Sequence, residues 1–310
     1  MDSVCALLGG EFQEKKICSP KASRKSLRIL RADRCNALGK TTHKAESNTT
    51  VELVNILLER YTWKNARRSF KSTKVALVPV GSTEQHGPHL PLGTDFLTAQ
   101  ALAESVAKKI NTICTPVIPV GVSSHHRQFW GTLWVSPDTF RRYMYEIAIS
   151  LGYHGIRRII FVNGHGGNSA SLQEVSQRLR LEGIYSIVYE WWTGPSVVKL
   201  QKRLFKSNGG HADAIETAMI LSIRPELVDT SSIREAATGA SSTWGVTKFG
   251  AQLTVDTIDF SRSGATLDPR EGTVEAGKRI RSAAEDNLLR LARWLEKTKQ
   301  QDIKTNSHLP

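Results

Sequence analysis

Cysteine is scarce in this sequence of 310 residues. Its four cysteines are Cys5, Cys18, Cys35 and Cys114. Three of them lie in the first 50 residues, which leaves too few elsewhere for a disulfide framework. None belongs to a Cys-x-x-Cys pair, so a zinc site built on cysteine is excluded as well. This usage is typical of a protein in a reducing compartment.

Long hydrophobic runs are also absent. Apolar runs such as 159–162 stop after four or five residues, whereas a membrane-spanning helix needs roughly 18 to 20. No apolar segment near the N-terminus is long enough to direct secretion. We therefore expect a protein that does not cross a membrane, is not secreted, and is cytoplasmic or organellar.

Acidic residues are in deficit, with 29 Asp and Glu against 42 Lys and Arg, for a formal charge of +13. Residues 1–50 form a basic N-terminal extension with ten basic and five acidic residues. Its Lys, Arg and Ser content is typical of a chloroplast-type transit peptide, whereas its acids favour a disordered tail, and both interpretations stay open. Basic residues elsewhere are scattered, so nucleic acid is not an expected partner.

From residue 51 onward, short apolar runs alternate with amphipathic segments. The apolar runs that predict buried strands are 75–80, 117–120, 159–162 and 184–188. The segments that predict helices are 51–58, 97–110, 137–152, 169–182, 212–222 and 272–299. This alternation predicts βαβ units and an α/β fold with a mainly parallel sheet. We expect one domain over residues 51–300, followed by a polar tail over 301–310.

Side chains able to bind metal follow the first predicted strand. Glu84 and His86 are two residues apart, so in an extended segment both side chains face the same way. Asp95 comes next, after a turn rich in glycine and proline. Because ligands collect at the carboxyl ends of strands in open α/β sheets, these residues are candidates for a common site.

Two further clusters contain the same residue types. His165 lies in a glycine-rich turn after the strand at 159–162, and His211 and Glu216 lie at the start of the helix at 212–222. Imidazole and carboxylate together suit zinc, manganese or iron, and a carboxylate can bridge two ions. The turn at 163–168 could instead cradle a phosphate at a helix N-terminus, although it lacks the G-x-G-x-x-G spacing and the P-loop lysine.

These segments carry a family resemblance. The stretch Gly81-Ser82-Thr83-Glu84-Gln85-His86-Gly87-Pro88-His89-Leu90-Pro91 resembles the signature of the creatininase (creatinine amidohydrolase) family. Asn163-Gly164-His165-Gly166-Gly167-Asn168 and His211-Ala212-x-x-x-Glu216-Thr217 resemble its later motifs, in the right order. The resemblance implies a three-layer α/β/α sandwich that hydrolyses a non-peptide C–N bond in a small, cyclic amide. It also implies two divalent metal ions per subunit (Zn, Mn or Fe) and a homo-oligomer such as a hexamer.

The resemblance also assigns roles to the metal-capable residues. Glu84 and His165 would hold one ion and His86 the other, with Asp95 as the bridge. Creatininase has a glutamate two residues after the motif histidine, where this chain has Gly167. Glu216 is then the expected replacement ligand.

Other positions concern catalysis and substrate. His211 is the candidate for proton transfer to the leaving nitrogen, with a purely helix-orienting role as the alternative. His126 aligns with a family histidine and is a second catalytic candidate that would contact substrate, whereas His125 replaces a usual glutamate. The remaining candidate substrate-binding residues are Ser123, Gly131, Thr132 and Trp191. We expect one of Trp130, Trp134, Trp191 and Trp192 to line the pocket.

Two other classes of function stay open at this point. One is a related hydrolase task, such as deformylation of a formamidopyrimidine nucleotide or cleavage of a modified peptide. A nucleotide would need a basic pocket, for which Arg127 and Lys248 are candidates. The other is a non-catalytic metal-binding or nucleic-acid-binding protein, for which the net charge is the only argument.

Overall fold

A four-stranded parallel sheet forms the centre of the protein, whose computed structural model describes residues 56–206 and 209–303. The strand order is β2-β1-β3-β4, with the bounds β1 (Ala76–Val80), β2 (Ile113–Cys114), β3 (Arg158–Asn163) and β4 (Tyr185–Glu190). Val80 at the end of β1 is paired with Asn163 at the end of β3. The segments that follow these two strands therefore leave the sheet at the same edge.

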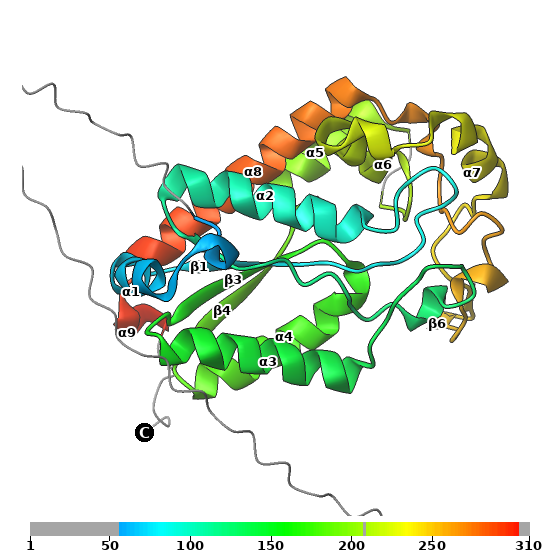
Figure 1. The fold of residues 1–310 in the computed structure, drawn as a ribbon. Helices are drawn as coiled ribbons and strands as arrows, with labels where there is room; N and C mark the ends of the chain where they lie inside the picture. Colours follow the sequence, from blue (N-terminus) through cyan, green and yellow to red (C-terminus); the bar gives the residue numbers. More distant parts are fainter. Residues whose placement is uncertain (1–55, 207–208, 304–310) are drawn as a thin grey trace, which may run out of the picture. The chain divides into compact units, whose positions relative to one another are not determined.

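Helices cover both faces of the sheet, which gives the three-layer α/β/α architecture (Figure 1). One face carries α2 (Thr94–Ile110), α5 (Pro195–Leu204), α6 (Ala214–Ile223) and α8 (Val274–Lys297), and the other carries α3 (Pro137–Tyr153) and α4 (Ser169–Leu181). Successive strand residues alternate between the two cores, as Ile160 packs with the first set and Phe161 with the second. Burial on both faces explains why β1 and β3 are almost continuous apolar runs.

Local signals set several helix ends. Ser136 and Thr273 accept hydrogen bonds from the backbone three residues on, as N-caps of α3 and α8. The predicted helices that lie within the described residues all correspond to observed ones, and the predicted parallel α/β class is confirmed. None of the described helices is both long and apolar enough to span a membrane.

The strand predicted over 117–120 is wrong. Only Ile118 contacts the sheet, through an isolated bridge to Val80, and the strand lies earlier, at β2. Pro116 and Pro119 explain the difference, since proline has no N–H to donate to a strand ladder.

The N-terminal and C-terminal predictions are tested only in part. The extension over 1–50 and most of the helix predicted over 51–58 lie outside the described residues. Leu57 forms a bridge to Cys114 at the sheet edge, and Leu58–Arg60 form a 3-10 turn. At the other end, α9 (Gln300–Ile303) reaches into the segment predicted as a polar tail, and Ile303 is buried.

Three helices, besides the short α9, were not anticipated from the sequence. α1 (Trp63–Ser72), α5 and α7 (Ile233–Gly239) were not predicted. A small exposed hairpin of β5 (Thr247–Lys248) and β6 (Ala251–Gln252) was not predicted either. These elements are short, since α1 and α5 have ten residues each and α7 has seven, which is less than the window of roughly 11 residues over which an apolar pattern is recognised.

Close packing of α6 against α8 depends on Gly277. A Cβ at this position would lie 1.8 Å from the backbone oxygen of Ala218, so the two helices would have to separate. We expect Gly277→Ala to lower the free energy of unfolding by about 1–3 kcal/mol or more, measured by chemical denaturation. Ser282→Ala, at an exposed position of α8, should have little effect. Equal stability of the two variants would contradict the proposed contact.

Candidate active site

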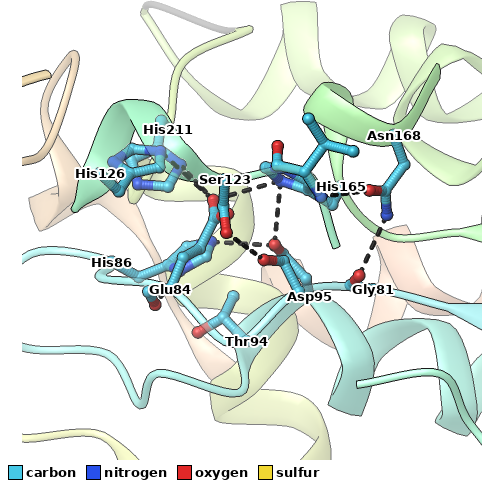
Figure 2. A network of polar contacts seen from close by, with 12 residues as sticks. Gly81, Glu84, His86, Thr94, Asp95, Ser123, His126, His165, Asn168 and His211 are labelled. Carbon is cyan, nitrogen blue, oxygen red and sulfur yellow. Dashed lines mark hydrogen bonds and ion pairs between the residues drawn. The ribbon is translucent and has the colours of Figure 1, made fainter. Parts of the chain in front are cut away.

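Four segments meet at the carboxyl edge of β1 and β3 (Figure 2). The loop after β1 carries Glu84 and His86, and the first turn of α2 carries Asp95. His165 follows β3 directly, and Glu216 lies in the first turn of α6. The structure thus brings together all five residues that the sequence suggested as metal ligands.

Asp95 stands between two groups of side chains. His165 Nδ1 lies 3.2 Å from Glu84 Oε1 and 3.2 Å from Asp95 Oδ2. On the other side, His86 Nε2 lies 3.0 Å from Asp95 Oδ1 and 3.7 Å from Glu216 Oε2. Each group offers three ligand atoms within 4.8 Å of one another. Asp95 belongs to both and turns a different oxygen to each.

Backbone carbonyls orient the two histidines of these groups. His165 Nε2 lies 2.9 Å from the oxygen of Val122, and His86 Nδ1 lies 3.1 Å from the oxygen of Glu84. Because a carbonyl only accepts, each of these ring nitrogens donates a hydrogen. The opposite nitrogen of each ring can then face the carboxylates with a lone pair, the arrangement typical of metal-ligating histidines.

Several polar atoms at the centre lack a hydrogen bond among the described residues. They are both carboxylate oxygens of Glu84, Asp95 Oδ2 and His86 Nε2, and all are buried. An unpaired buried carboxylate is costly, and a cation would compensate for it. The donor set of imidazoles and carboxylates therefore fits zinc, manganese or iron.

Burial and mutual charge shift the pKa values strongly. Burial would lower the pKa of His86, but the carboxylates of Asp95 and Glu216 outweigh it and raise the value to about 10. Burial raises the pKa of Glu216 to about 8. Burial also lowers the pKa of His211, and the nearby His86 lowers it further. The central carboxylates thus favour the protonated, positively charged form of His86, whereas His211 stays neutral.

Glycines allow the turn around His165 to pack closely. A Cβ at Gly164 would lie 2.2 Å from the backbone oxygen of Asp95. A Cβ at Gly167 would lie 2.3 Å from the oxygen of Val122 and 2.4 Å from the His165 ring. No side chain fits at position 167 without rearrangement, so this position cannot supply a metal-ligating side chain.

The start of α6 is organised by Asp213. Its carboxylate accepts hydrogen bonds from the backbone N–H groups of Gly210, Ile215 and Glu216, as expected for an N-cap. Asp213 therefore holds the N-terminus of α6 in place. The Glu216 carboxylate accepts from the N–H of Ala212 at 2.6 Å, which holds it beside His86.

His89 connects the first motif to α6. Its Nε2 lies 2.8 Å from Thr217 Oγ1, and that hydroxyl donates to the oxygen of Asp213. The hydroxyl can then only accept from His89. His89 is a supporting residue rather than part of the central cluster.

A cavity of about 490 Å³ opens onto the centre. Its walls contain His125, His126 and His211 together with four aromatic side chains. The aromatic residues are Trp191, Trp192, Trp244 and Phe260.

Trp244 was missed by sequence reasoning. Its ring centroid lies 5.7 Å from that of His211 and 5.9 Å from that of His126. It stands on a loop outside every recognised motif, so no sequence signal pointed to it.

Several suggested substrate-binding residues are not in the cavity wall. Trp130 is 98% exposed, and Trp134 is also exposed. Ser123 Oγ contacts Ser82 Oγ and donates to the oxygen of Leu133. Gly131 and Thr132 do not line the cavity. Thr132 Oγ1 accepts from the N–H of Gln85, so it supports the motif loop instead.

Comparisons with known proteins agree with this geometry. Residues 59–292 match the family model "Creatininase: Creatinine amidohydrolase". The chain is 34% identical over 232 residues to the mycofactocin precursor peptide peptidase of Mycobacterium ulcerans (strain Agy99), covering 70% of this chain and 84% of that protein. It is 28% identical over 193 residues to the creatinine amidohydrolase of Pseudomonas putida, covering 56% and 74%. A solved structure named "Creatininase Mn" matches with a TM-score of 0.66 at 23% identity, covering 77% and 97%.

The fold and these matches place the chain among amidohydrolases. It belongs to the creatininase family, because the family model covers well over half of its length. The two relatives are named for different substrates, a precursor peptide and creatinine. Family membership therefore leaves the substrate of this chain to be argued from its own site.

Proposed function

We propose that this protein is a hydrolase with two divalent metal ions that cleaves a C–N amide bond of a small, uncharged substrate. The observation that carries the proposal is the position of Asp95. Its two oxygens each belong to a separate group of three candidate ligand atoms. Glu84 and His165 would complete one site, and His86 and Glu216 the other.

The chemistry of the site follows from this arrangement. Divalent ions held there supply a nucleophile from water near neutral pH and polarise a carbonyl. His211 lines the cavity with its Nδ1 3.9 Å from Glu84 Oε1. A neutral imidazole at this place can take a proton from the attacking water and give it to the leaving nitrogen.

The cavity walls support an uncharged substrate with a flat group. Among the described residues that line it, none is Lys or Arg. Arg127 is held by Asp256 through an ion pair, and Lys248 lies on the exposed hairpin. This favours a cyclic amide over a formamidopyrimidine nucleotide, whose phosphate would need a basic partner.

A peptide amide is a second candidate substrate. It is favoured by the similarity to a precursor peptide peptidase over 84% of that relative's length. The same aromatic walls could hold an apolar or aromatic side chain of a short peptide. Zinc, manganese and iron remain alternative metals, because their ligand preferences overlap.

Metal analysis of the purified full-length chain tests the proposal, followed by assays with Zn or Mn restored after chelation. The substrates to compare are creatinine, other cyclic amides, formamides and short peptides. Two metals per chain and a hydrolytic activity lost on chelation would support the proposal. Absence of bound metal after addition of Zn and Mn would contradict it and favour a non-catalytic binding protein.

Trp244 is expected to contribute to substrate binding. Removing its ring by Trp244→Ala should raise KM by about 3- to 10-fold, the range expected from the loss of one aromatic stacking contact. Steady-state kinetics on the best substrate would measure it. Trp130→Ala, which removes an exposed ring away from the cavity, is the matched control. An equal change in both variants would argue against a role of Trp244 in the pocket.

A further inference from the structure

Gln85 lies buried between the two motif residues Glu84 and His86, and its amide orientation is fixed by the backbone. Its Oε1 accepts from the N–H of Gly87 at 2.9 Å, and its Nε2 donates to the oxygen of Gly264 at 3.1 Å. An N–H group can only donate and a carbonyl can only accept. The amide therefore has one orientation that satisfies both partners.

This orientation determines which nitrogen of His126 carries a hydrogen. The second hydrogen on Gln85 Nε2 faces His126 Nδ1 at 2.7 Å. His126 Nδ1 must accept, so the hydrogen of the neutral ring lies on Nε2. That nitrogen is buried without a hydrogen-bond partner of good geometry and lies 3.3 Å from Glu84 Oε1.

The other three central histidines have the opposite arrangement. His86 and His165 donate outward to backbone carbonyls. His211 Nε2 lies 2.9 Å from the backbone oxygen of Gln85 and 3.0 Å from Gln85 Nε2. Because a carbonyl can only accept, His211 Nε2 donates to it and cannot also accept the second amide hydrogen of Gln85, which is left for His126. When neutral, these three rings can turn only a lone pair toward the centre.

We propose that Gln85 is a positioning residue that holds His126 as the imidazole presenting an N–H to the catalytic centre, an inference that rests on the proposed function. His126 lines the cavity beside His211 and Glu84 (Figure 2). An N–H donor there can hydrogen-bond an oxygen that gains negative charge when an amide carbonyl is attacked, which a lone pair cannot do.

Gly264 supports the same interpretation. It has a positive φ of 79°, and a Cβ there would lie 1.9 Å from Gln85 Oε1. The backbone therefore leaves room for this amide and for no alternative side chain at position 264. Gln85, Gly264 and His126 form one interlocking set that comes from three distant parts of the chain.

Nitrogen NMR of the full-length chain, labelled with ¹⁵N in histidine, tests the proposal through the protonation of each ring nitrogen. In the native protein, His126 should show an unprotonated Nδ1 and a protonated Nε2. Gln85→Glu replaces the donor by an acceptor, so Nδ1 of His126 should become protonated. Gln85→Met removes both functions and should leave a mixture of the two neutral forms. Both variants should lower kcat by about 10- to 100-fold, as is usual for residues that orient catalytic groups.

Gln201→Glu is the control for the spectra, because it adds the same charge to the cavity wall and, within the described part of the chain, Gln201 has no side-chain hydrogen bond to the histidines. It should leave His126 in its native form. A native His126 protonated at Nδ1, or one unchanged in both Gln85 variants, would overturn the proposal. The spectra depend neither on bound metal nor on turnover. Absence of metal would contradict the proposed function, and it can therefore be told apart from a failure of the proposal about Gln85 and His126.

Discussion

Replacing Asp95 with asparagine is expected to lower metal content from two ions per chain to one or none and to reduce hydrolysis by at least about 10³-fold. The magnitude follows from the several kcal/mol of transition-state stabilisation that metal ions supply in hydrolases, at tenfold per 1.36 kcal/mol. The physical reason is that both groups of candidate ligand atoms include an Asp95 oxygen. An amide offers one neutral oxygen donor in place of two oxygens that share a negative charge, so it cannot serve both sites.

Elemental analysis and the hydrolytic rate, measured on the same preparation, check this prediction. Asp138→Asn is the matched control, because Asp138 is an exposed aspartate in the first turn of another helix, α3. It should retain both metals and full activity. Two tightly bound metals in Asp95→Asn would show that the sites do not share this carboxylate, and the bridging role of Asp95 would have to be abandoned.

The parts of the fold that were predictable are those with strong periodicity. Strands β1 and β3 are buried on both faces, β4 at the sheet edge is mostly half-buried, and all three contain apolar runs. The long helices α2, α3 and α8 have clear apolar faces. Segment 117–120 shows the limit of this signal. Its apolar residues are buried or half-buried as expected. Neighbouring prolines nevertheless prevent a strand ladder because they have no N–H to donate, and an apolar pattern carries no information about hydrogen-bond donors.

The site shows a similar division. Glu84, His86, Asp95 and His165 were predictable because they follow strands and have metal-binding chemistry. Trp244 was not, since an aromatic on an irregular loop gives no periodic signal. Gln85 lies inside the most recognisable motif, yet its partners His126 and Gly264 are 41 and 179 residues away. Only the folded chain shows that they meet.

Replacing His211 with alanine is expected to lower the hydrolytic rate by about 10²- to 10⁴-fold, the usual contribution of a general acid–base group, while metal content stays at two. The structure favours a chemical role for this side chain over a helix-orienting one. The N–H of His211 donates to Thr266 Oγ1 at 2.7 Å, and the N–H of Ala212 binds Glu216. Both contacts come from the backbone and survive the substitution.

Two alternatives make different predictions for the same variant. His211 also belongs to a third group of possible metal-ligating residues, with Glu84 and His86, and a ligand role would lower metal content together with the rate. A structural role would lower stability and leave the rate per folded molecule unchanged.

Alanine also leaves the buried carbonyl of Gln85 without its donor, which costs about 1–3 kcal/mol. His211→Gln can keep that donor but cannot accept and return a proton, so it should be as slow as alanine and more stable. His154→Ala, an exposed histidine at the end of α3, should change neither quantity. A fast His211→Gln enzyme would remove His211 from proton transfer.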